Sequence, residues 1–182
     1  MNIQKILEEY LKIYPEEANI QKPLKDFLKD NIELSNPKSS KGHMTAMAIV
    51  YCENLNSILL LQHKDLNVWL APGGHSELND TSMLETAIRE LKEETGLTNL
   101  KCVSMSNNIL VPLDINSHLI PKSDKKNMPE HYHHDFRYLF IIENEKEIKI
   151  DDKESNSYIW VNINELNNDK IFGVIVKKIK NR

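Results

Sequence analysis

Residues 73–97 constrain the fold more strongly than any other segment of the chain. Two glycines precede a helical stretch in this segment, and one glycine follows it. At about 100° per residue, one face of that helix gathers three carboxylates within an arc of about 100°: Glu90, Glu93 and Glu94. The opposite side carries the apolar stripe that we expect to be buried: Leu84, Ile88, Leu91 and Thr95.

Three carboxylates on one helical face repel one another unless a cation lies between them. Glu90 and Glu94 are four residues apart, and like charges at this spacing destabilise a helix by about 0.2–0.5 kcal/mol. A hard cation such as Mg²⁺ relieves the repulsion, because it binds a few carboxylates and completes its shell with phosphate oxygens and water. The alternative is a solvated acidic face on which Arg89 pairs with Glu93. The flanking glycines and the Arg-Glu-x-x-Glu-Glu order favour the metal site.

Both ends of this helix carry suitable capping residues. Ser82 is the expected N-cap, and Glu85 three residues later completes a capping box. Gly96 suits the C-terminal end, because glycine adopts the left-handed backbone conformation without strain.

The order of these residues resembles the signature of the Nudix hydrolase family. That signature reads Gly, five residues, Glu, seven residues, and then Arg-Glu-U-x-Glu-Glu-x-Gly-U, where U is a bulky apolar residue. Its second half matches at every position: Arg89, Glu90, Leu91, Glu93, Glu94, Gly96 and Leu97. In the first half, Asp80 follows Gly74 after five residues, and eight rather than seven residues separate it from Arg89. Thr81 therefore stands at the signature's Glu position, and we expect Glu77 or Asp80 to substitute.

The resemblance implies a Nudix-type α/β/α sandwich with a mixed sheet and the hydrolysis of a phosphoanhydride, typically in a nucleoside diphosphate linked to another moiety. It assigns the three glutamates to Mg²⁺ or Mn²⁺ and gives Arg89 the role of orienting them through ion pairs. The backbone of Gly73 and Gly74 would support the loop against the helix, and Gly74 is also a candidate for contact with the substrate. The general base is either a motif glutamate, such as Glu93 or Glu94, or a carboxylate from a later loop. Glu154 is the later-loop candidate, and its alternative is an ordinary exposed charge.

A second polar group lies further along the chain and comprises His118, His131, His133, Asp135 and Arg137. His131, His133 and Asp135 alternate, so they share one face of a predicted strand. Such a set ligates a transition metal, hydrogen-bonds a substrate phosphate, or is simply an ordinary surface group. The block resembles a Nudix branch known mainly as hydrolases of unassigned substrate.

The N-terminal part of the chain predicts two helices. Apolar residues at helical spacing place the first at about 2–13, and Pro23 is well placed to open the second. The polar stretch Ser35 to Lys41 marks a boundary. We therefore expect residues 1–41 to form a helical extension and 42–182 the main domain. The extension packs on that domain, binds a partner or shapes the substrate pocket.

Apolar runs in the main domain alternate with turn residues. They predict a hairpin of strands at 45–52 and 57–62, a short strand at 68–71, and strands near 101–111, 133–142 and 158–161. A closing helix is expected at about 164–180, with one apolar stripe: Ile171, Val174, Ile175 and Ile179.

The composition limits the partners and the location. The net charge is −4 without a basic stripe, which makes nucleic acid an unlikely partner. Two short lysine clusters, 125–126 and 177–180, are interpreted as solvated surface. No apolar run approaches the ~18 residues of a membrane span. Cys52 and Cys102 are interpreted as buried thiols of a reducing compartment. A cytoplasmic protein acting on a nucleotide or diphosphate is expected, and a homodimer is compatible with the resemblance.

Three rival functions differ from this interpretation. An isomerase of the same fold acting on isopentenyl diphosphate would need a catalytic cysteine, and neither cysteine stands in the required context. A non-catalytic nucleotide-binding or sensor module would be expected to lose the glutamates, and all three are present. An enzyme for capped or triphosphorylated RNA would be expected to show a basic groove.

Overall fold

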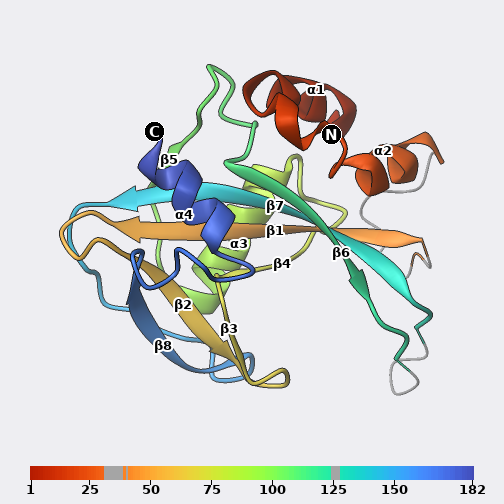
Figure 1. Ribbon diagram of the computed structural model, residues 1–182. Helices are drawn as coiled ribbons and strands as arrows, with labels where there is room; N and C mark the ends of the chain where they lie inside the picture. Colours follow the sequence, from red (N-terminus) through yellow and green to blue (C-terminus); the bar gives the residue numbers. More distant parts are fainter. Residues whose placement is uncertain (31–38, 40, 124–127) are drawn as a thin grey trace.

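The computed structural model describes residues 1–30, 39, 41–123 and 128–182. Within these ranges an eight-stranded mixed sheet has helices on both faces (Figure 1). Two parallel strands, β1 (Gly42–Cys52) and β7 (His131–Ile142), run through its centre. Both are almost continuously buried, as strands covered on two faces must be. The expected mixed-sheet α/β fold is confirmed.

The neighbours of the central pair change along its length. Near their N-terminal ends, β1 pairs with β4 (Gly73–His75) and β7 pairs with β6 (Asp114–Ile120). Near their C-terminal ends, the neighbours are β2 (Ser57–His63) and β5 (Lys101–Val103). β2 also pairs with β3 (Val68–Leu70) and β8 (Ser155–Asn162). The end that carries β4 and β6 holds the polar groups described below.

Two apolar clusters fill the space between the sheet and its helices. α3 (Met83–Thr95) packs on the face that carries Ala46 and Ala48 of β1. α4 (Gly173–Lys180) packs on the opposite face, against Ile49 and Tyr51. The alternation of these β1 residues follows from the two-residue period of a strand. The result is a three-layered arrangement with the motif helix on one side only (Figure 1).

The N-terminal helices share the core on the α3 side. α1 (Ile3–Ile13) is followed by a 3₁₀ turn (η1, Pro15–Ala18) and by α2 (Lys22–Lys29), so the two predicted helices are confirmed. They contribute buried side chains to the cluster beneath α3: Ile3, Ile6, Leu7, Tyr10, Leu24 and Phe27. The expected boundary stretch lies almost wholly in residues 31–38 and 40, outside the described residues.

The strand predicted near 101–111 was wrong over most of its length. β5 ends at Val103, and the next residues form turns closed by polar side chains. Ser104 Oγ donates to the carbonyls of Asn108 and Val111, and Asn108 Oδ1 accepts from the Leu110 N–H. Serine and asparagine side chains offer the backbone these local partners in place of a sheet ladder. The chain then enters β6, a strand that the sequence did not predict.

The closing helix was predicted nine residues too long, because α4 begins only at Gly173. Asp169 Oδ1 accepts from the N–H groups of both Ile171 and Phe172, which holds the preceding residues in turns. Ile171 and Val174 are 42% and 41% exposed, against the predicted stripe.

A lysine near the end of α4 contradicts the prediction that both lysine clusters are solvated. Lys178 is buried rather than solvated, and Lys125 and Lys126 lie outside the described residues.

Cys52 is buried, Cys102 is half-buried, and both are free thiols. No helix within the described ranges has the length and apolar character to cross a membrane.

Candidate active site

The caps of α3 fix where the motif helix begins and ends. Ser82 Oγ accepts from the Glu85 N–H at 3.1 Å, as predicted. The Glu85 carboxylate closes the turn one residue earlier than in a standard capping box, on the Thr81 N–H at 2.7 Å. Gly96 ends the helix with φ of +70° and donates its N–H to the Lys92 carbonyl at 2.9 Å.

Two of the three motif glutamates, Glu90 and Glu94, do not lie on a solvated face. Glu90 and Glu94 are 9% and 8% exposed, whereas Ile88, predicted to be buried, is 47% exposed. The helix is covered by β4 as well as by the central strands, so its buried arc includes Glu90 and Glu94 and excludes Ile88. Glu93 stays exposed beside them.

Arg89 connects the glutamates to the loop before the helix. Its Nη1 lies 2.9 Å from Glu90 Oε1 and 3.1 Å from Glu93 Oε2, and its Nη2 lies 3.2 Å from Asp80 Oδ2. Burial raises the pKa of Asp80, but the hydrogen bonds from Arg89, the Glu77 N–H and Thr86, together with the charge of Arg89, outweigh it and the net shift is downward. Of the two carboxylates expected to replace the missing signature Glu, Asp80 therefore forms the firm ion pair. Glu77 is exposed and 3.9 Å away.

The two glycines before the helix touch the two buried glutamates. The Gly73 N–H donates to Glu94 Oε1 at 2.7 Å. A Cβ placed on Gly74 would lie 2.6 Å from the Glu90 carboxyl carbon. Only a residue without a side chain allows this approach. The Pro-Gly-Gly turn thus presses the β4 backbone against the carboxylates.

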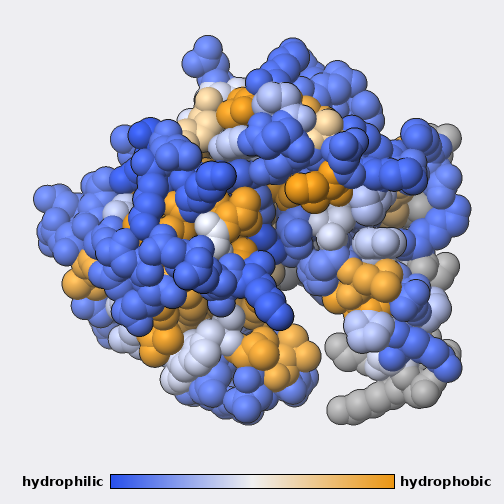
Figure 2. Space-filling model, in the orientation of Figure 1, coloured by the Kyte–Doolittle hydropathy of each residue, from blue (hydrophilic) through white to orange (hydrophobic). Residues whose placement is uncertain are grey.

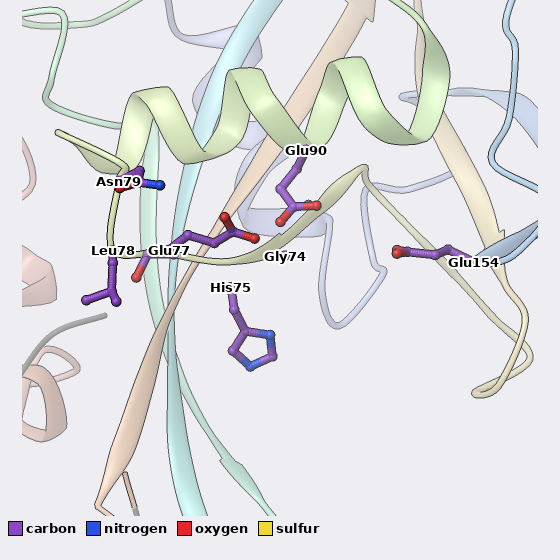
Figure 3. A pocket seen from close by; sticks show the side chains of 9 residues that line it. Gly74, His75, Glu77, Leu78, Asn79, Glu90 and Glu154 are labelled. Carbon is purple, nitrogen blue, oxygen red and sulfur yellow. The ribbon is translucent and has the colours of Figure 1, made fainter. Parts of the chain in front are cut away.

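A cleft of about 590 Å³ opens beside these residues. It runs along β4 and the following loop, with Glu90 on one wall and Glu154 at the rim (Figure 3). Glu154 lies 64 residues beyond Glu90 in the chain, yet its carboxylate points toward the same space. The later-loop candidate is therefore at the cleft and also exposed.

The electrostatics of the cleft favour a bound cation. Burial raises the pKa of Glu94 to about 8, and the negative charges of Glu90 and Glu154 add to the rise. Burial also raises the pKa of Glu90, against the opposing effect of Arg89. A divalent ion would supply the missing positive charge, and carboxylate oxygens are the ligands that Mg²⁺ and Mn²⁺ prefer. The residues present therefore fit the metal that the sequence motif implies.

Five histidines gather at the end of the sheet beyond β4. They come from four strands: His43, His75, His118, His131 and His133. His43 and His133 are direct partners in the β1–β7 ladder. Neighbouring ring centroids lie 4.6–5.7 Å apart. Burial lowers the pKa of His43 to about 4 and that of His133 to about 3, so both rings are neutral at pH 7.

The sequence predicted three of these histidines and missed His43 and His75. The missing signal was the pairing of β1 with β7, strands that are almost 90 residues apart. Within the described residues, His43, His131 and His133 form the one group of three whose potential ligand atoms already lie within 4.8 Å of one another.

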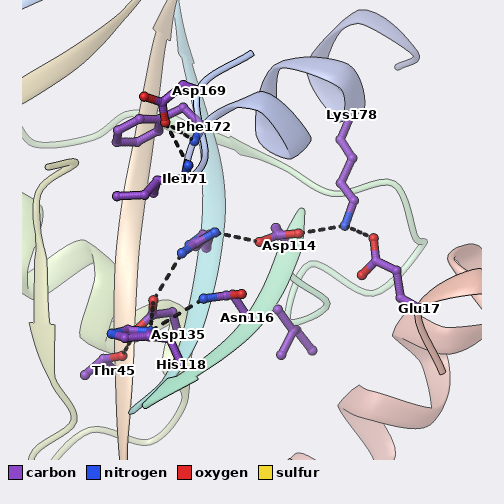
Figure 4. Close-up of polar contacts among 12 residues, drawn as sticks. Glu17, Thr45, Asp114, Asn116, His118, Asp135, Asp169, Ile171, Phe172 and Lys178 are labelled. Carbon is purple, nitrogen blue, oxygen red and sulfur yellow. Dashed lines mark hydrogen bonds and ion pairs between the residues drawn. The ribbon is translucent and has the colours of Figure 1, made fainter. Parts of the chain in front are cut away.

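Asp135 lies beside His118 and, with Arg137, belongs to a chain of buried ion pairs (Figure 4). They are 1% and 4% exposed. Arg137 Nη2 lies 3.2 Å from Asp135 Oδ2, and Nη1 lies 3.0 Å from Asp114 Oδ2. Asp114 is 2.8 Å from Lys178 Nζ of α4, which is 2.7 Å from Glu17 Oε1 of η1. The chain of charges links the histidines to the N-terminal turn and the C-terminal helix.

The surface is hollowed between the body of the sheet and the arm formed by the outer ends of β1, β6 and β7 (Figures 1 and 2). Hydrophilic side chains cover much of the surface in this view (Figure 2). The histidines of the arm lie on the parts of these strands that extend beyond the core.

A family model described as NUDIX domain matches residues 42–179, well over half of the chain. The chain belongs to the NUDIX family. The match begins at the first residue of β1 and includes the glutamates, the cleft and the histidines.

Two curated relatives of this NUDIX chain carry descriptive names. A "Probable DHNTP pyrophosphohydrolase" of Lactococcus lactis subsp. cremoris is 34% identical over 116 residues, which are 64% of each protein. An "m7GpppN-mRNA hydrolase NUDT17" of Xenopus laevis is 30% identical over 138 residues, covering 69% of this chain and 44% of that protein. The chain thus spans less than two thirds of the length of either relative.

Solved structures share the fold. The E. coli dihydroneopterin triphosphate pyrophosphohydrolase superposes with a TM-score of 0.60 at 16% identity, covering 79% of this chain and 94% of that one. A NUDIX-family hydrolase from Clostridium perfringens gives a TM-score of 0.57 at 25% identity, covering 76% and 96%. At such identities the likeness concerns the NUDIX fold and leaves the substrate open.

Proposed function

We propose that this chain is a metal-dependent pyrophosphohydrolase that cleaves a phosphoanhydride in a nucleotide or a related diphosphate. The observation that carries the proposal is the buried pair Glu90 and Glu94, held against Gly74 and Gly73 beside an open cleft that Glu90 and both glycines line. Two buried carboxylates without full compensation destabilise a protein unless they serve to bind a cation. Relatives named as a pyrophosphohydrolase and an mRNA hydrolase support a hydrolytic reaction.

Glu90, Glu93 and Glu94 would hold Mg²⁺ or Mn²⁺, which when bound polarises phosphoryl oxygens and lowers the pKa of a water molecule. Gly73 orients Glu94 through its N–H group, and Arg89 orients Glu90 and Glu93. Arg89 acts as a positioning residue, because its five N–H donors are taken up by Asp80, the glutamates and the His75 carbonyl.

Glu154 is our candidate for the general base. It lies at the cleft rim opposite Glu90, within reach of solvent. It would accept the proton of a water molecule as the water oxygen attacks phosphorus and the bridging P–O bond breaks. General-base catalysis of this kind typically contributes about 10²–10⁴-fold to the rate.

We assign the residues of the histidine block to different roles. His118 is exposed on the arm, and Asp135 Oδ2 lies 3.4 Å from its Nδ1. We propose that His118 contacts substrate and that Asp135 and Arg137 position it, because both are too deeply buried to reach a ligand. We further propose that residues 1–41 are a helical extension on the NUDIX domain and that the protein acts in the cytoplasm.

The substrate class is tested by assaying a panel with and without Mg²⁺. The panel contains dihydroneopterin triphosphate, a capped dinucleotide, ADP-ribose, a dinucleoside polyphosphate and nucleoside triphosphates. We expect turnover of at least one compound that excess chelator abolishes. Loss of the cation-binding carboxylates in Glu90→Gln and Glu94→Gln should lower turnover by about 10²–10³-fold.

The matched control is Glu145→Gln, because Glu145 is an exposed glutamate far from the cleft. A non-catalytic nucleotide-binding module would bind panel compounds and turn over none. Full activity of Glu94→Gln, or full activity in excess chelator, would exclude the proposed chemistry.

A further inference from the structure

We propose that His43, His131 and His133 form a second metal site, separate from the carboxylate cleft, which takes a transition-metal cation of the Zn²⁺ class. The proposal does not depend on the hydrolase reaction. It rests on the positions of three imidazoles, on the backbone carbonyls that lie against one nitrogen in each of two rings, and on one buried ring nitrogen without a partner.

The strands bring the three rings together on one face of the sheet. His43 of β1 and His133 of β7 are ladder partners, and His131 lies two residues before His133 on the same strand. Their potential ligand atoms lie within 4.8 Å of one another. Zn–N bonds of about 2.1 Å require tetrahedral nitrogens about 3.4 Å apart, so small side-chain rotations suffice.

In two of the rings, one nitrogen lies within hydrogen-bond distance of a backbone carbonyl. His43 Nε2 lies 2.9 Å from the Ser39 oxygen, and His131 Nδ1 lies 2.7 Å from the Pro129 oxygen. A carbonyl only accepts hydrogen bonds, so these nitrogens carry the protons. The lone pairs then belong to His43 Nδ1 and His131 Nε2. Metal-binding histidines use their second nitrogen in this way, which fixes the tautomer and the orientation of the ring.

The other ring nitrogen of His43 lacks a partner, which points to a bound cation independently of the ring positions. His43 is 5% exposed, and its Nδ1 is buried without a hydrogen-bond partner. Burying an acceptor without a partner is unfavourable, and native structures rarely retain one without a reason. A bound cation would satisfy this nitrogen.

The donor set selects the class of cation. Three neutral imidazoles suit Zn²⁺ and its neighbours, whereas Mg²⁺ prefers the carboxylate oxygens of the cleft. Three histidines leave one coordination position for water or another ligand. His75 is the nearest further imidazole, with its ring 5.3 Å from His43 and 5.0 Å from His133, and it also lines the cleft.

The test is Zn²⁺ titration of chelator-treated full-length protein by calorimetry, with Co²⁺ absorption spectra as a geometric readout. The background is the Glu90→Gln, Glu94→Gln double variant, which removes the carboxylate site. We expect one equivalent of Zn²⁺ to bind, a tetrahedral Co²⁺ spectrum, and no competition from excess Mg²⁺. In His131→Gln the affinity should fall by at least about 10-fold, since losing even an outer-shell partner of a ligand typically costs 10–100-fold.

His63→Gln is the matched control, because His63 lies on β2 outside the cluster. This variant should bind Zn²⁺ with the same affinity as the double-variant background. His43→Gln and His133→Gln should repeat the loss, and the melting temperature of each variant without Zn²⁺ reports whether it folds. The proposal would be overturned if the double-variant background and the same protein with His131→Gln bound Zn²⁺ with equal affinity. The absence of Zn²⁺ binding to the double-variant background would also overturn it, whether or not the protein with intact glutamates binds Zn²⁺.

Discussion

The backbone N–H of Gly73 donates to Glu94 Oε1 at 2.7 Å, so β4 and the motif helix are joined at a carboxylate. The next residue, Gly74, leaves room for the Glu90 carboxylate where any other residue would place a Cβ. Two consecutive glycines thus act on two different glutamates. The position of the acidic cleft depends on both.

Alanine substitutions at the two glycines should have different consequences. In Gly74→Ala the new methyl group meets the movable end of Glu90, so we expect the fold to persist and the activity to fall by about 10-fold or more as the carboxylate is displaced. In Gly73→Ala the methyl group meets backbone, with the Met47 Cα 2.8 Å away, and the protein should lose about 1–3 kcal/mol of stability. Chemical denaturation and steady-state kinetics on both variants separate these effects. Equal stability losses would refute the distinction.

Glu154→Gln should lower kcat by about 10²–10⁴-fold with little change in KM, because a general base acts on the transition state. Glu145→Gln serves as the control for a lost surface charge. An unchanged kcat in Glu154→Gln would transfer the role to a motif glutamate.

The metal-free protein should become less stable as the pH rises toward 8. The folded pKa of Glu94, about 8, lies above its ordinary value of 4.5, so the native state retains a proton that the unfolded state has lost. The corresponding stabilisation is complete below about pH 4.5 and disappears as the pH passes through about 8. His43 and His133 do not interfere above pH 6.5, because their pKa values are shifted downward.

Melting temperatures of chelated protein between about pH 6.5 and about pH 9 measure this effect. The decline should be shallower in Glu94→Gln, and Mg²⁺ should oppose it, since the cation replaces the proton. Parallel curves for the two proteins would show that Glu94 is ionised throughout.

Lys178→Met should destabilise the protein strongly. Lys178 is 2.7 Å from Glu17 Oε1 and 2.8 Å from Asp114 Oδ1. Its loss leaves the buried Glu17 carboxylate without its cation and leaves Asp114 with Arg137 alone. Breaking a buried ion pair in this way costs about 3–5 kcal/mol. The exposed pair of Lys22 and Asp26 provides the comparison, and Lys22→Met should cost under about 1 kcal/mol. Urea unfolding of both variants tests the difference, and similar midpoints would contradict it.

The sequence by itself determined the features that depend on short-range order. The 3.6-residue period placed Glu90, Glu93 and Glu94 on one face, and Ser82 and Gly96 fixed the ends of their helix. Apolar runs gave most of the strands. Local rules failed where polar side chains formed turns, as after Val103 and around Asp169.

Only the tertiary structure decided which residues meet across long stretches of chain. The β1–β7 pairing places His43 beside His133, and the turn before β8 brings Glu154 to the cleft of Glu90. Packing of β4 against α3 buried Glu90 and Glu94, which an isolated helix would expose. Such contacts follow from strand order and layer packing, which depend on the whole hydrophobic core, whereas local periodicity reports only which face of an element a residue occupies.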